Sequence, residues 1–515
     1  MSAVLIAIMV VPLVAAAISW WAGPRLTSAV TVTSGAAIFG LALALVPTVA
    51  RGRPVGRART VRAHAGAGSQ VVVYGQHAVS ALGNGLRVDS LSLVFLLATA
   101  FLYALTAIFA VGYVSAEHGA GALYRRRLFA GMNVFAWAMA MAPLVNNLGL
   151  LWVAIEVTTV VSALLVAIEE TDSAIEAAWK YVLLASLGLG LSLLATVIMY
   201  HAGSYSLGQE YDLSFTRLVG AAGRFPPGTV RLAYLLAVLG FGTKVGFFPV
   251  HTWLPDAHSE APTPVSALLS GALLATCFYA ILRYYQITER AAGPTFARDV
   301  LAGFGVATLL LGALYLASQR DLKRMLAYSS VEHMGILAIG MSFASPLAVA
   351  GVLLHVLAHA AAKGTAFFGA GSVVRKMRTK DLERIRGGMG LLPWSGPLLV
   401  AAMLGLSALP PFGTFRSEFS IVAGGLSGSS GGAGQAVSAV LVVLVTLAFL
   451  GLSWHITQVM ASPGPSGAAP LAKGETSKLM VLAMSVALLG LVILGVHPPG
   501  QLDNLFHGAV SELGV

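Results

Sequence analysis

The chain has 515 residues and a net charge of +10, with 57% hydrophobic residues, 57 glycines and only 10% charged residues. Soluble domains contain about 45–50% apolar residues, glycine included, and about 25% charged residues. This composition therefore excludes a soluble globular protein and indicates an integral membrane protein. The positive charge does not indicate a nucleic-acid partner, because Lys and Arg lie in short loops between apolar runs, where membrane proteins carry their orientation signals.

Apolar runs recur along the whole chain, each long enough for the ~20 residues that a helix needs to cross a bilayer. We expect an all-α membrane protein with about 14 transmembrane helices. The predicted spans are 3–22, 27–50, 88–113, 128–146, 148–168, 175–200, 231–252, 262–286, 299–318, 324–343, 346–374, 392–424, 436–460 and 477–496. Lys and Arg are more numerous in the odd-numbered loops, which favours a cytoplasmic location for those loops.

Cofactor chemistry is restricted by the cysteine count and by missing motifs. Cys277 is the only cysteine, so the chain has no disulfide framework, no CxxC pair and no iron–sulfur cluster held by cysteines alone. The sequence has no GxxxxGK[ST] loop and no GxGxxG after a strand-like run. We therefore expect no nucleotide, redox centre or other cofactor in this chain, and a buried structural role for Cys277.

Ionisable residues inside the spans are informative, because a charge at mid-helix costs about 2.5–3.5 kcal/mol on insertion scales. Glu156 lies in LLWVAIEVTTVVSALL, and Lys244 lies in LLAVLGFGTKVGFFPV. A nearby Glu156 carboxylate would hold Lys244 protonated, whereas separation would let burial favour the neutral amine. We interpret Lys244 as a proton loading site, with a permanent buried ion pair as the alternative.

A second set of ionisable residues lies in VLLHVLAHAAAKGTAFF. His355, His359 and Lys363 are spaced i, i+4, i+8, which places all three on one helical face. Such a row suits a proton relay whose members are bridged by water, and hydrogen bonding between helices is the alternative. A metal site fits poorly, because Lys363 would repel the cation.

Glycine and proline interrupt two spans, at 240–255 and 405–415. Broken helices at corresponding places in two halves of a chain are a pointer to an ion site built on inverted repeats. Lys244 and Glu418 flank these interruptions, where freed backbone carbonyls could hold water.

Polar residues also follow the first interruption, namely His251, Asp256, His258 and Glu260. They could form a proton entrance at the membrane surface. Alternatively, Asp256 and the neighbouring Ser259 could cap a helix.

Three segments together resemble a known family. They are KVGFFPVHTWLPDAHSEAPTPVSALLS at 244–270, YSSVEHMG at 328–335 and HVLAHAAAKG at 355–364. These segments resemble the antiporter-like membrane subunits of respiratory complex I, of energy-converting and formate-hydrogenlyase-type hydrogenases, and of multisubunit cation/proton antiporters. They look most like the hydrogenase-type branch, and the resemblance covers roughly residues 86–497.

The resemblance implies a fold of about 14 transmembrane helices with two inverted five-helix repeats and two broken helices. It implies N-terminal transmembrane helices at 1–127, a first antiporter-like repeat at 128–286, a second at 287–460 and a C-terminal helix and tail at 461–515. It also implies a proton path along a central polar axis. The residues of that axis would be Glu156, Lys244, His333, His355, His359, Lys363 and Glu418.

One departure from the family pattern affects this path. The ionisable residue that some relatives carry on the helix after Lys244 is absent, and Ser270 and Ala275 occupy the two candidate positions for it. Water would have to bridge the step from Lys244 to the central histidines.

These observations favour a proton-translocating, non-redox subunit of a multisubunit redox-driven complex, either NADH-quinone oxidoreductase-like or hydrogenase-like, in the cell inner (plasma) membrane. Its expected partners are other membrane subunits, a soluble electron-transfer arm with iron–sulfur proteins, and the lipid bilayer. A cation/proton antiporter or inorganic-carbon uptake complex without electron transfer is the second hypothesis. A structural anchor is the third, and the cost of idle buried charges argues against it.

Overall fold

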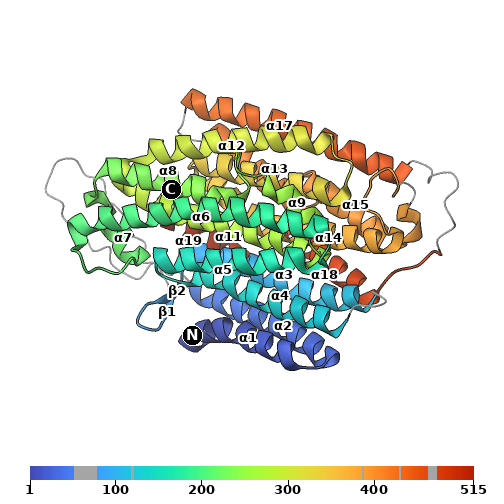
Figure 1. Cartoon of the computed structure of the whole chain (residues 1–515). Coiled ribbons are helices and arrows are strands. Elements are labelled where there is room, and N and C mark those ends of the chain that lie inside the picture. Colours follow the sequence, from blue (N-terminus) through green and yellow to red (C-terminus); the bar gives the residue numbers. More distant parts are fainter. Residues whose placement is uncertain (51–77, 117–120, 386–387, 428–430, 462–471) are drawn as a thin grey trace.

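Long apolar helices dominate the structure, a computed structural model that describes residues 1–50, 78–116, 121–385, 388–427, 431–461 and 472–515. Within these residues, eleven helices are long and apolar enough to cross a membrane. They lie side by side in one bundle (Figure 1). A helix satisfies its backbone polar groups within its own segment, which is why apolar runs in lipid adopt it. The chain is therefore a multi-pass helical membrane protein.

The elements up to the first interruption are α1 (Ser2–Trp21), α2 (Pro24–Ala50), β1 (Val79–Ala81), β2 (Leu86–Val88), α3 (Ser90–Ser115), α4 (Ala122–Leu144), α5 (Leu148–Val166), η1 (Ala167–Glu169), α6 (Asp172–Leu207), α7 (Phe215–Ala221), η2 (Ala222–Arg224) and α8 (Pro227–Val245). The later elements are α9 (Trp253–Glu260), α10 (Thr263–Leu268), η3 (Leu269–Leu273), α11 (Leu274–Ala292), α12 (Pro294–Ala317), α13 (Leu322–Ser342), α14 (Pro346–Met377), η4 (Gly388–Leu391), α15 (Ser395–Leu406), α16 (Gly413–Ser427), α17 (Gly431–Ala461), α18 (Lys478–Val496) and α19 (Gly500–Glu512). The two strands pair antiparallel.

Both interruptions predicted from glycine and proline are present. Helix α8 ends at Val245 and α9 begins at Trp253, while α15 ends at Leu406 and α16 begins at Gly413. The predicted span 231–252 is therefore too long, because its last residues belong to the first break. The hairpin β1–β2 and the helices α7 and α19 were not predicted, because they are too short to register as membrane-crossing runs.

The centre of the bundle is formed by α3, by the continuous segment α10–η3–α11 and by α14. The most apolar stretch of 263–292 is entirely buried, and those of α3 and α14 are 83% and 89% buried. In contrast, the corresponding stretches of α1 and α17 are each 33% buried, and these two helices lie at opposite edges of the bundle (Figure 1). Side chains on the central helices are therefore shielded from lipid.

Two glycines bring α6 and α8 into direct contact. A Cβ atom added to Gly188 on α6 would lie 2.4 Å from Oγ1 of Thr243, and one added to Gly240 on α8 would lie 2.6 Å from the backbone nitrogen of Ser192. Any larger residue would separate the two helices. This close approach fixes the position of Lys244, which directly follows Thr243 on α8.

A buried ion pair joins α11 to the beginning of α3. Nη2 of Arg283 lies 2.6 and 2.8 Å from the two carboxylate oxygens of Asp89, whose Oδ1 also accepts a hydrogen bond from the backbone nitrogen of Ser92. Burial alone would raise the pKa of Asp89, but the Arg283 guanidinium holds it below its usual range. The carboxylate of Glu512 on α19 accepts hydrogen bonds from the backbone nitrogens of residues 90 and 91. The C-terminal helix is thereby fastened to α3.

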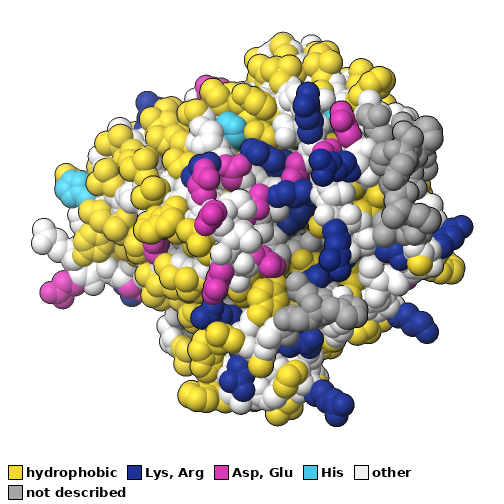
Figure 2. Space-filling model, turned by 45° about the vertical axis from the view of Figure 1, so that its right-hand side comes forward, with side chains coloured by type: hydrophobic (Ala, Val, Ile, Leu, Met, Phe, Trp, Pro, Cys, Tyr) yellow, Lys and Arg dark blue, Asp and Glu magenta, His cyan; other side chains and the backbone are white. Residues whose placement is uncertain are grey.

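Charged side chains gather at one end of the bundle. Figure 2 shows Lys, Arg, Asp and Glu side chains together on the end that it brings forward, bordered by hydrophobic surface. An end that is rich in Lys and Arg is typical of the cytoplasmic side of a membrane protein.

Candidate functional site

Lys244 lies in a fully buried polar site between α8 and α5. Its side chain is 0% exposed, and its Nζ donates hydrogen bonds to Oγ1 of Thr158 at 3.0 Å and to Oγ1 of Thr159 at 2.9 Å. Both hydroxyls donate their own protons to the carbonyl of Ile155, so their lone pairs face the lysine. Nζ also lies 5.4 Å from the centre of the Tyr181 ring. The site therefore accommodates an ammonium group without a carboxylate in contact.

Glu156 does not contact Lys244. In the described part of the chain, no ion pair joins the two residues, and the buried Oε2 atom of Glu156 has no hydrogen-bond partner. The two charges still act on each other electrostatically. The permanent ion pair considered from the sequence is thus not what the structure contains, because the two threonines occupy the contact positions around the ammonium.

A second buried lysine lies further along the bundle. Nζ of Lys363 on α14 donates hydrogen bonds to the carbonyl of Leu326 at 3.0 Å and to the hydroxyl of Ser329, both on α13. The next residue, Ser330, is hydrogen-bonded to Ser270 with 2.6 Å between their hydroxyl oxygens. Ser270 belongs to η3, a turn of π-helix, a feature that is frequent at functional sites. Ser270, one of the two candidate positions for the missing ionisable residue, thus links η3 to α13, the helix that binds Lys363.

Three histidines meet where α13, α14 and α16 pack together. Nε2 of His355 lies 3.1 Å from Nδ1 of His333, and Nδ1 of His355 lies 2.9 Å from the hydroxyl of Ser417. Oε1 of Glu418 lies 3.8 Å from Nδ1 of His333. The ring of His359 packs against both other histidine rings, and neither of its nitrogens has a hydrogen-bond partner among the described residues. All three histidines are 0% exposed.

The face predicted from the i, i+4, i+8 spacing is therefore directed at α13. His355 bonds His333, and Lys363 bonds Ser329, so both ends of the row contact that helix. Ligand atoms of His333, His355 and Glu418 lie within 4.8 Å of one another, a spacing that a metal ion could use. A hydrogen bond already joins the two rings, and the Lys363 ammonium on the same helix disfavours a cation. Proton exchange suits this group better than metal binding.

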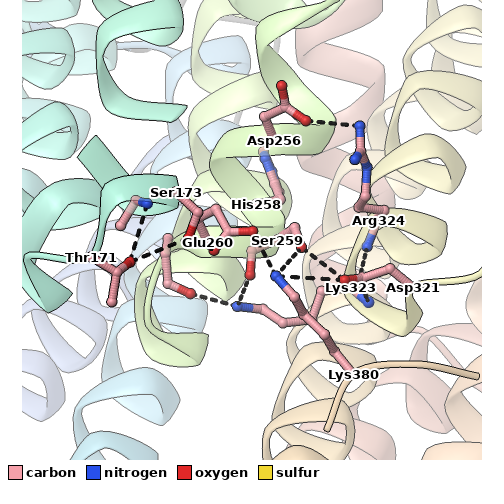
Figure 3. Close-up of polar contacts among 12 residues, drawn as sticks. Thr171, Ser173, Asp256, His258, Ser259, Glu260, Asp321, Lys323, Arg324 and Lys380 are labelled. Atoms are coloured by element: carbon pink, nitrogen blue, oxygen red, sulfur yellow. Dashed lines mark hydrogen bonds and ion pairs between the residues drawn. The ribbon is translucent and has the colours of Figure 1, made fainter. Parts of the chain in front are cut away.

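The residues after the first interruption belong to a network of ion pairs at the charged end. Oδ1 of Asp256 lies 2.8 Å from Arg324, and its Oδ2 lies 3.3 Å from Lys180. Glu260 pairs with Lys380 at 2.6 Å and accepts a hydrogen bond from Ser173. Figure 3 shows that these side chains converge from α6, α9, α13 and the segment that follows α14.

This network leaves little support for the capping alternative. The hydroxyl of Ser259 donates to Oδ2 of Asp321, and α9 has no side-chain cap at its beginning. Nζ of Lys323 donates to the carbonyls of Ser259 and Ala261. Although burial alone would raise the pKa of Glu260, the hydrogen bond and charge of Lys380 hold that pKa below its usual range. Glu260 therefore stays ionised at neutral pH.

The two histidines of this region differ from the acidic pair. His258 is 0% exposed and its Nδ1 lies 2.8 Å from the carbonyl of Leu254, while its buried Nε2 has no partner among the described residues. His251 is 6% exposed, and its Nδ1 is similarly without a partner there. Both rings are more buried than the side chains of Asp256 and Glu260, which are 22% and 24% exposed.

Several polar residues of the axis were not identified from the sequence. One is Glu332, which lies within the motif YSSVEHMG and is 4% exposed. Four others carry hydroxyl groups that bond the buried lysines and histidines: Thr158, Thr159, Ser329 and Ser417. Ser330 instead bonds the hydroxyl of Ser270. Buried Ser and Thr in helices commonly bond their own backbone, so the sequence alone gives no signal that singles them out.

The fold and the buried polar axis together define an antiporter-like membrane subunit. Residues 145–448 match the transmembrane family described as NADH:quinone oxidoreductase/Mrp antiporter. The chain belongs to this family, and the resemblance found in its motifs is confirmed.

Curated relatives carry hydrogenase names. The chain is 36% identical over 345 residues to the hydrogenase-4 component F homolog of Methylacidiphilum infernorum, which covers 66% of this chain and 72% of that relative. It is 30% identical over 347 residues to hydrogenase-4 component B of Escherichia coli, and spans half the length of that relative.

A solved structure of an Mrp complex from Dietzia sp. DQ12-45-1b has the same fold. Its matching chain superposes with a TM-score of 0.81 at 20% sequence identity, over 99% of this chain and 97% of that chain. At this identity the likeness establishes the fold alone.

Proposed function

We propose that this chain is a proton-translocating membrane subunit of a multisubunit redox-driven complex of the hydrogenase or NADH-quinone oxidoreductase type. Electron transfer would take place in partner subunits, and this chain would move protons. The hydrogenase names of its curated relatives support the redox reading.

One observation carries the proposal. Titratable groups that are fully buried at the centre of the bundle contact one another from helix to helix, with His355 hydrogen-bonded to both His333 and Ser417. Buried ionisable groups in a membrane are costly and mark ion pathways. A row that exchanges hydrogen bonds can pass a proton along it, which explains why the cost is tolerated.

The path begins at the charged end of the bundle, in this proposal. Protons enter near Asp256 and Glu260 and continue past His251 and His258. They then load Lys244, whose affinity for the proton depends on the distance to Glu156.

The second half of the path follows α14. From Lys244, the proton crosses by water and by the Ser270–Ser330 hydroxyl pair to Lys363. It then passes His359, His355 and His333, and reaches Glu418. The contact distances among the histidines support this order.

The finer architecture belongs to the same proposal. We infer about 14 membrane-crossing segments, because α4, α13 and the α15–α16 pair lie in the same bundle as the eleven apolar helices. The breaks after α8 and α15 support two inverted five-helix repeats, at 128–286 and 287–460, flanked by N-terminal helices at 1–127 and a C-terminal helix and tail at 461–515.

The chain would lie in the cell inner (plasma) membrane with no cofactor of its own, beside other membrane subunits and a soluble arm with iron–sulfur proteins. The family description, which also covers Mrp antiporters, favours one rival, a cation/proton antiporter without electron transfer. The same axis would serve in both.

The test uses membrane vesicles that hold the whole complex, energised by the electron donor that the native membranes oxidise through it. Proton uptake per donor oxidised is compared between wild type and Lys363→Met. A matched control is Lys376→Met on the same helix, because among the described residues the Lys376 ammonium bonds the carbonyl of Gly474, outside the axis. We expect Lys363→Met to lose at least nine-tenths of the uptake and the control to retain it.

Assembly is checked by native gel electrophoresis of the complex. Full uptake in an assembled Lys363→Met complex would contradict proton translocation along this axis. A complex that oxidises no donor, but exchanges cations for protons in the same vesicles, would replace the redox reading with the antiporter reading.

A further inference from the structure

Arg416 is a charged residue inside a membrane-spanning segment that the proton path does not use. It lies on α16 between Phe415 and Ser417, and it is exposed on the outside of the bundle. The hydroxyl of Ser420 bonds the backbone carbonyl of Arg416, but the guanidinium has no hydrogen bond or ion pair among the described residues. A charge at such a place is costly and calls for a functional explanation.

The histidine cluster fixes the depth of Arg416 in the bundle. The hydroxyl of Ser417, the next residue, lies 2.9 Å from Nδ1 of His355. Oε1 of Glu418, one residue further along α16, lies 3.8 Å from Nδ1 of His333. His333 is near the middle of α13, whose 21 residues span about 30 Å, the thickness of the hydrocarbon core of a bilayer. Arg416 therefore lies near the middle of the membrane and not at its surface.

The side of α16 that carries Arg416 faces away from the rest of the chain. Phe415 is 40% exposed, Phe419 is 65% exposed and Leu426 is 52% exposed, and their spacing places them on one side of the helix. The rings of Phe415 and Phe419 stack with 6.1 Å between their centres. These three side chains and Arg416 form the outer strip of α16, an apolar surface that contains a cation.

Lipid headgroups do not account for an arginine in this strip. The headgroups begin about 15 Å from the middle of the bilayer, which is further than an arginine side chain extends. Long basic side chains reach the membrane surface only from positions near helix ends. In an apolar surrounding, a guanidinium is stabilised best by a carboxylate, which it binds through two parallel hydrogen bonds. The charge of Arg416 therefore calls for a carboxylate at the same depth.

The described part of the chain does not supply that carboxylate. Glu418 is the acidic residue nearest to Arg416 in the sequence, but residues two positions apart on a helix do not face each other. The Glu418 side chain is directed at His333 instead. A neighbouring chain in the membrane is the source that remains.

We propose that the outer strip of α16 is the contact surface for a membrane helix of a different subunit, which carries an Asp or Glu at mid-depth that pairs with Arg416. The proposal rests on the part of the proposed function that places this chain in a complex with other membrane subunits. Apolar side chains of the partner helix pack on Phe415 and Phe419 and exclude lipid from the ion pair. The pair then fixes the depth and the orientation of the partner helix, because charge pairs at an interface set its register.

The first experiment measures how much intact complex is recovered when this chain is purified from membranes with its partner subunits. Arg416→Leu should lower the recovery at least about fivefold, because the partner's carboxylate stays buried without its cation. Arg416→Lys keeps the charge and should retain a measurable part of the assembly. Arg126→Leu is the control, since Arg126 is an exposed arginine at the beginning of α4 and not at mid-depth.

The sign of the effect separates a partner helix from lipid. If the outer strip faces lipid in the assembled complex, Arg416→Leu removes a costly charge from the hydrocarbon. The complex would then be recovered as well as wild type, or better. Either of these two results would overturn the proposal.

The second experiment identifies the partner with Arg416 left in place. The photo-crosslinking residue benzoylphenylalanine replaces Phe419, and the whole complex is irradiated in its native membranes. We expect an adduct with a different membrane subunit, in a membrane helix that contains an Asp or Glu. Exchanging the charges, with Arg416→Asp in this chain and arginine in place of the partner's carboxylate, should restore the assembly that either single change removes.

This second experiment decides the matter if Arg416→Leu fails to fold. An adduct with lipid alone, or with a second copy of this chain, would overturn the proposal. So would an adduct with a partner helix that contains no acidic residue.

The outcomes separate this inference from the proposed function. Wild-type assembly of Arg416→Leu, with proton uptake abolished in Lys363→Met, would overturn the contact and leave the proton path intact. Loss of assembly in Arg416→Leu, with wild-type uptake in assembled Lys363→Met, would support the contact and overturn the path.

Discussion

The two threonine hydroxyls around Lys244 lead to a quantitative prediction. Thr158→Val together with Thr159→Val removes both hydrogen bonds to the buried Nζ while nearly preserving side-chain shape. A hydrogen bond to a charged group contributes about 1.5–3 kcal/mol, so the ammonium form loses at least ~3 kcal/mol. Since 1.36 kcal/mol corresponds to a factor of ten, the ratio of protonated to neutral Lys244 falls roughly a hundredfold.

The assay is proton uptake in vesicles that hold the whole complex, normalised to assembled complex. We expect the double variant to lose at least nine-tenths of its uptake, and Thr158→Ser with Thr159→Ser to retain most of it. Thr365→Val is the matched control, because in the part of the chain that the structure describes the hydroxyl of Thr365 bonds the carbonyl of Ala361 on its own helix. Wild-type uptake in the double valine variant would refute the reasoning that these hydroxyls hold the proton on Lys244.

Three further predictions concern stability, measured by thermal unfolding of the purified complex. Arg283→Met leaves the buried Asp89 without its partner and should destabilise the fold by about 3–5 kcal/mol; a loss below ~1 kcal/mol would contradict the buried pair. Glu260→Gln removes a carboxyl group whose pKa is lowered on folding by Lys380. The ionised carboxylate therefore stabilises the fold fully at pH values above the ordinary pKa of 4.5, and this stabilisation is lost as the pH falls through the lowered pKa. The stability difference from wild type should therefore be present at pH 7 and shrink below pH ~4, and a difference that grows in acid would be inconsistent with this sign. Gly188→Ala should separate α6 from α8 and destabilise the fold by about 1–3 kcal/mol, which an unchanged unfolding temperature would disprove.

Much of the architecture follows from the sequence because a bilayer imposes one local rule, an apolar run of sufficient length. That rule located the main spans, and glycine and proline located the breaks after α8 and α15. It did not locate α19, which is short and is fastened to α3 by Glu512 rather than by length. The position of α19 depends on a contact between residues more than 400 positions apart in the sequence, and no local sequence pattern predicts such a contact.

The candidate site was predictable where one helix carries the pattern and not where several helices meet. The spacing of His355 and Lys363 predicted a shared face, and both residues do contact α13. Glu156 was expected to act on Lys244, but the sequence could not tell that threonine hydroxyls take the contact positions. Glu332 stands beside His333 in the same motif, and only the packing of the helices around α13 reveals that it is buried.

The most direct test of proton translocation by this chain is proton uptake by vesicles that hold the whole complex, compared between wild type and Lys244→Ala while the natural electron donor is oxidised. The account predicts that an assembled Lys244→Ala complex loses most or all of its uptake, because Lys244 joins the entrance to the rest of the axis. Unchanged uptake in that variant would contradict the account and leave an anchoring role for this chain.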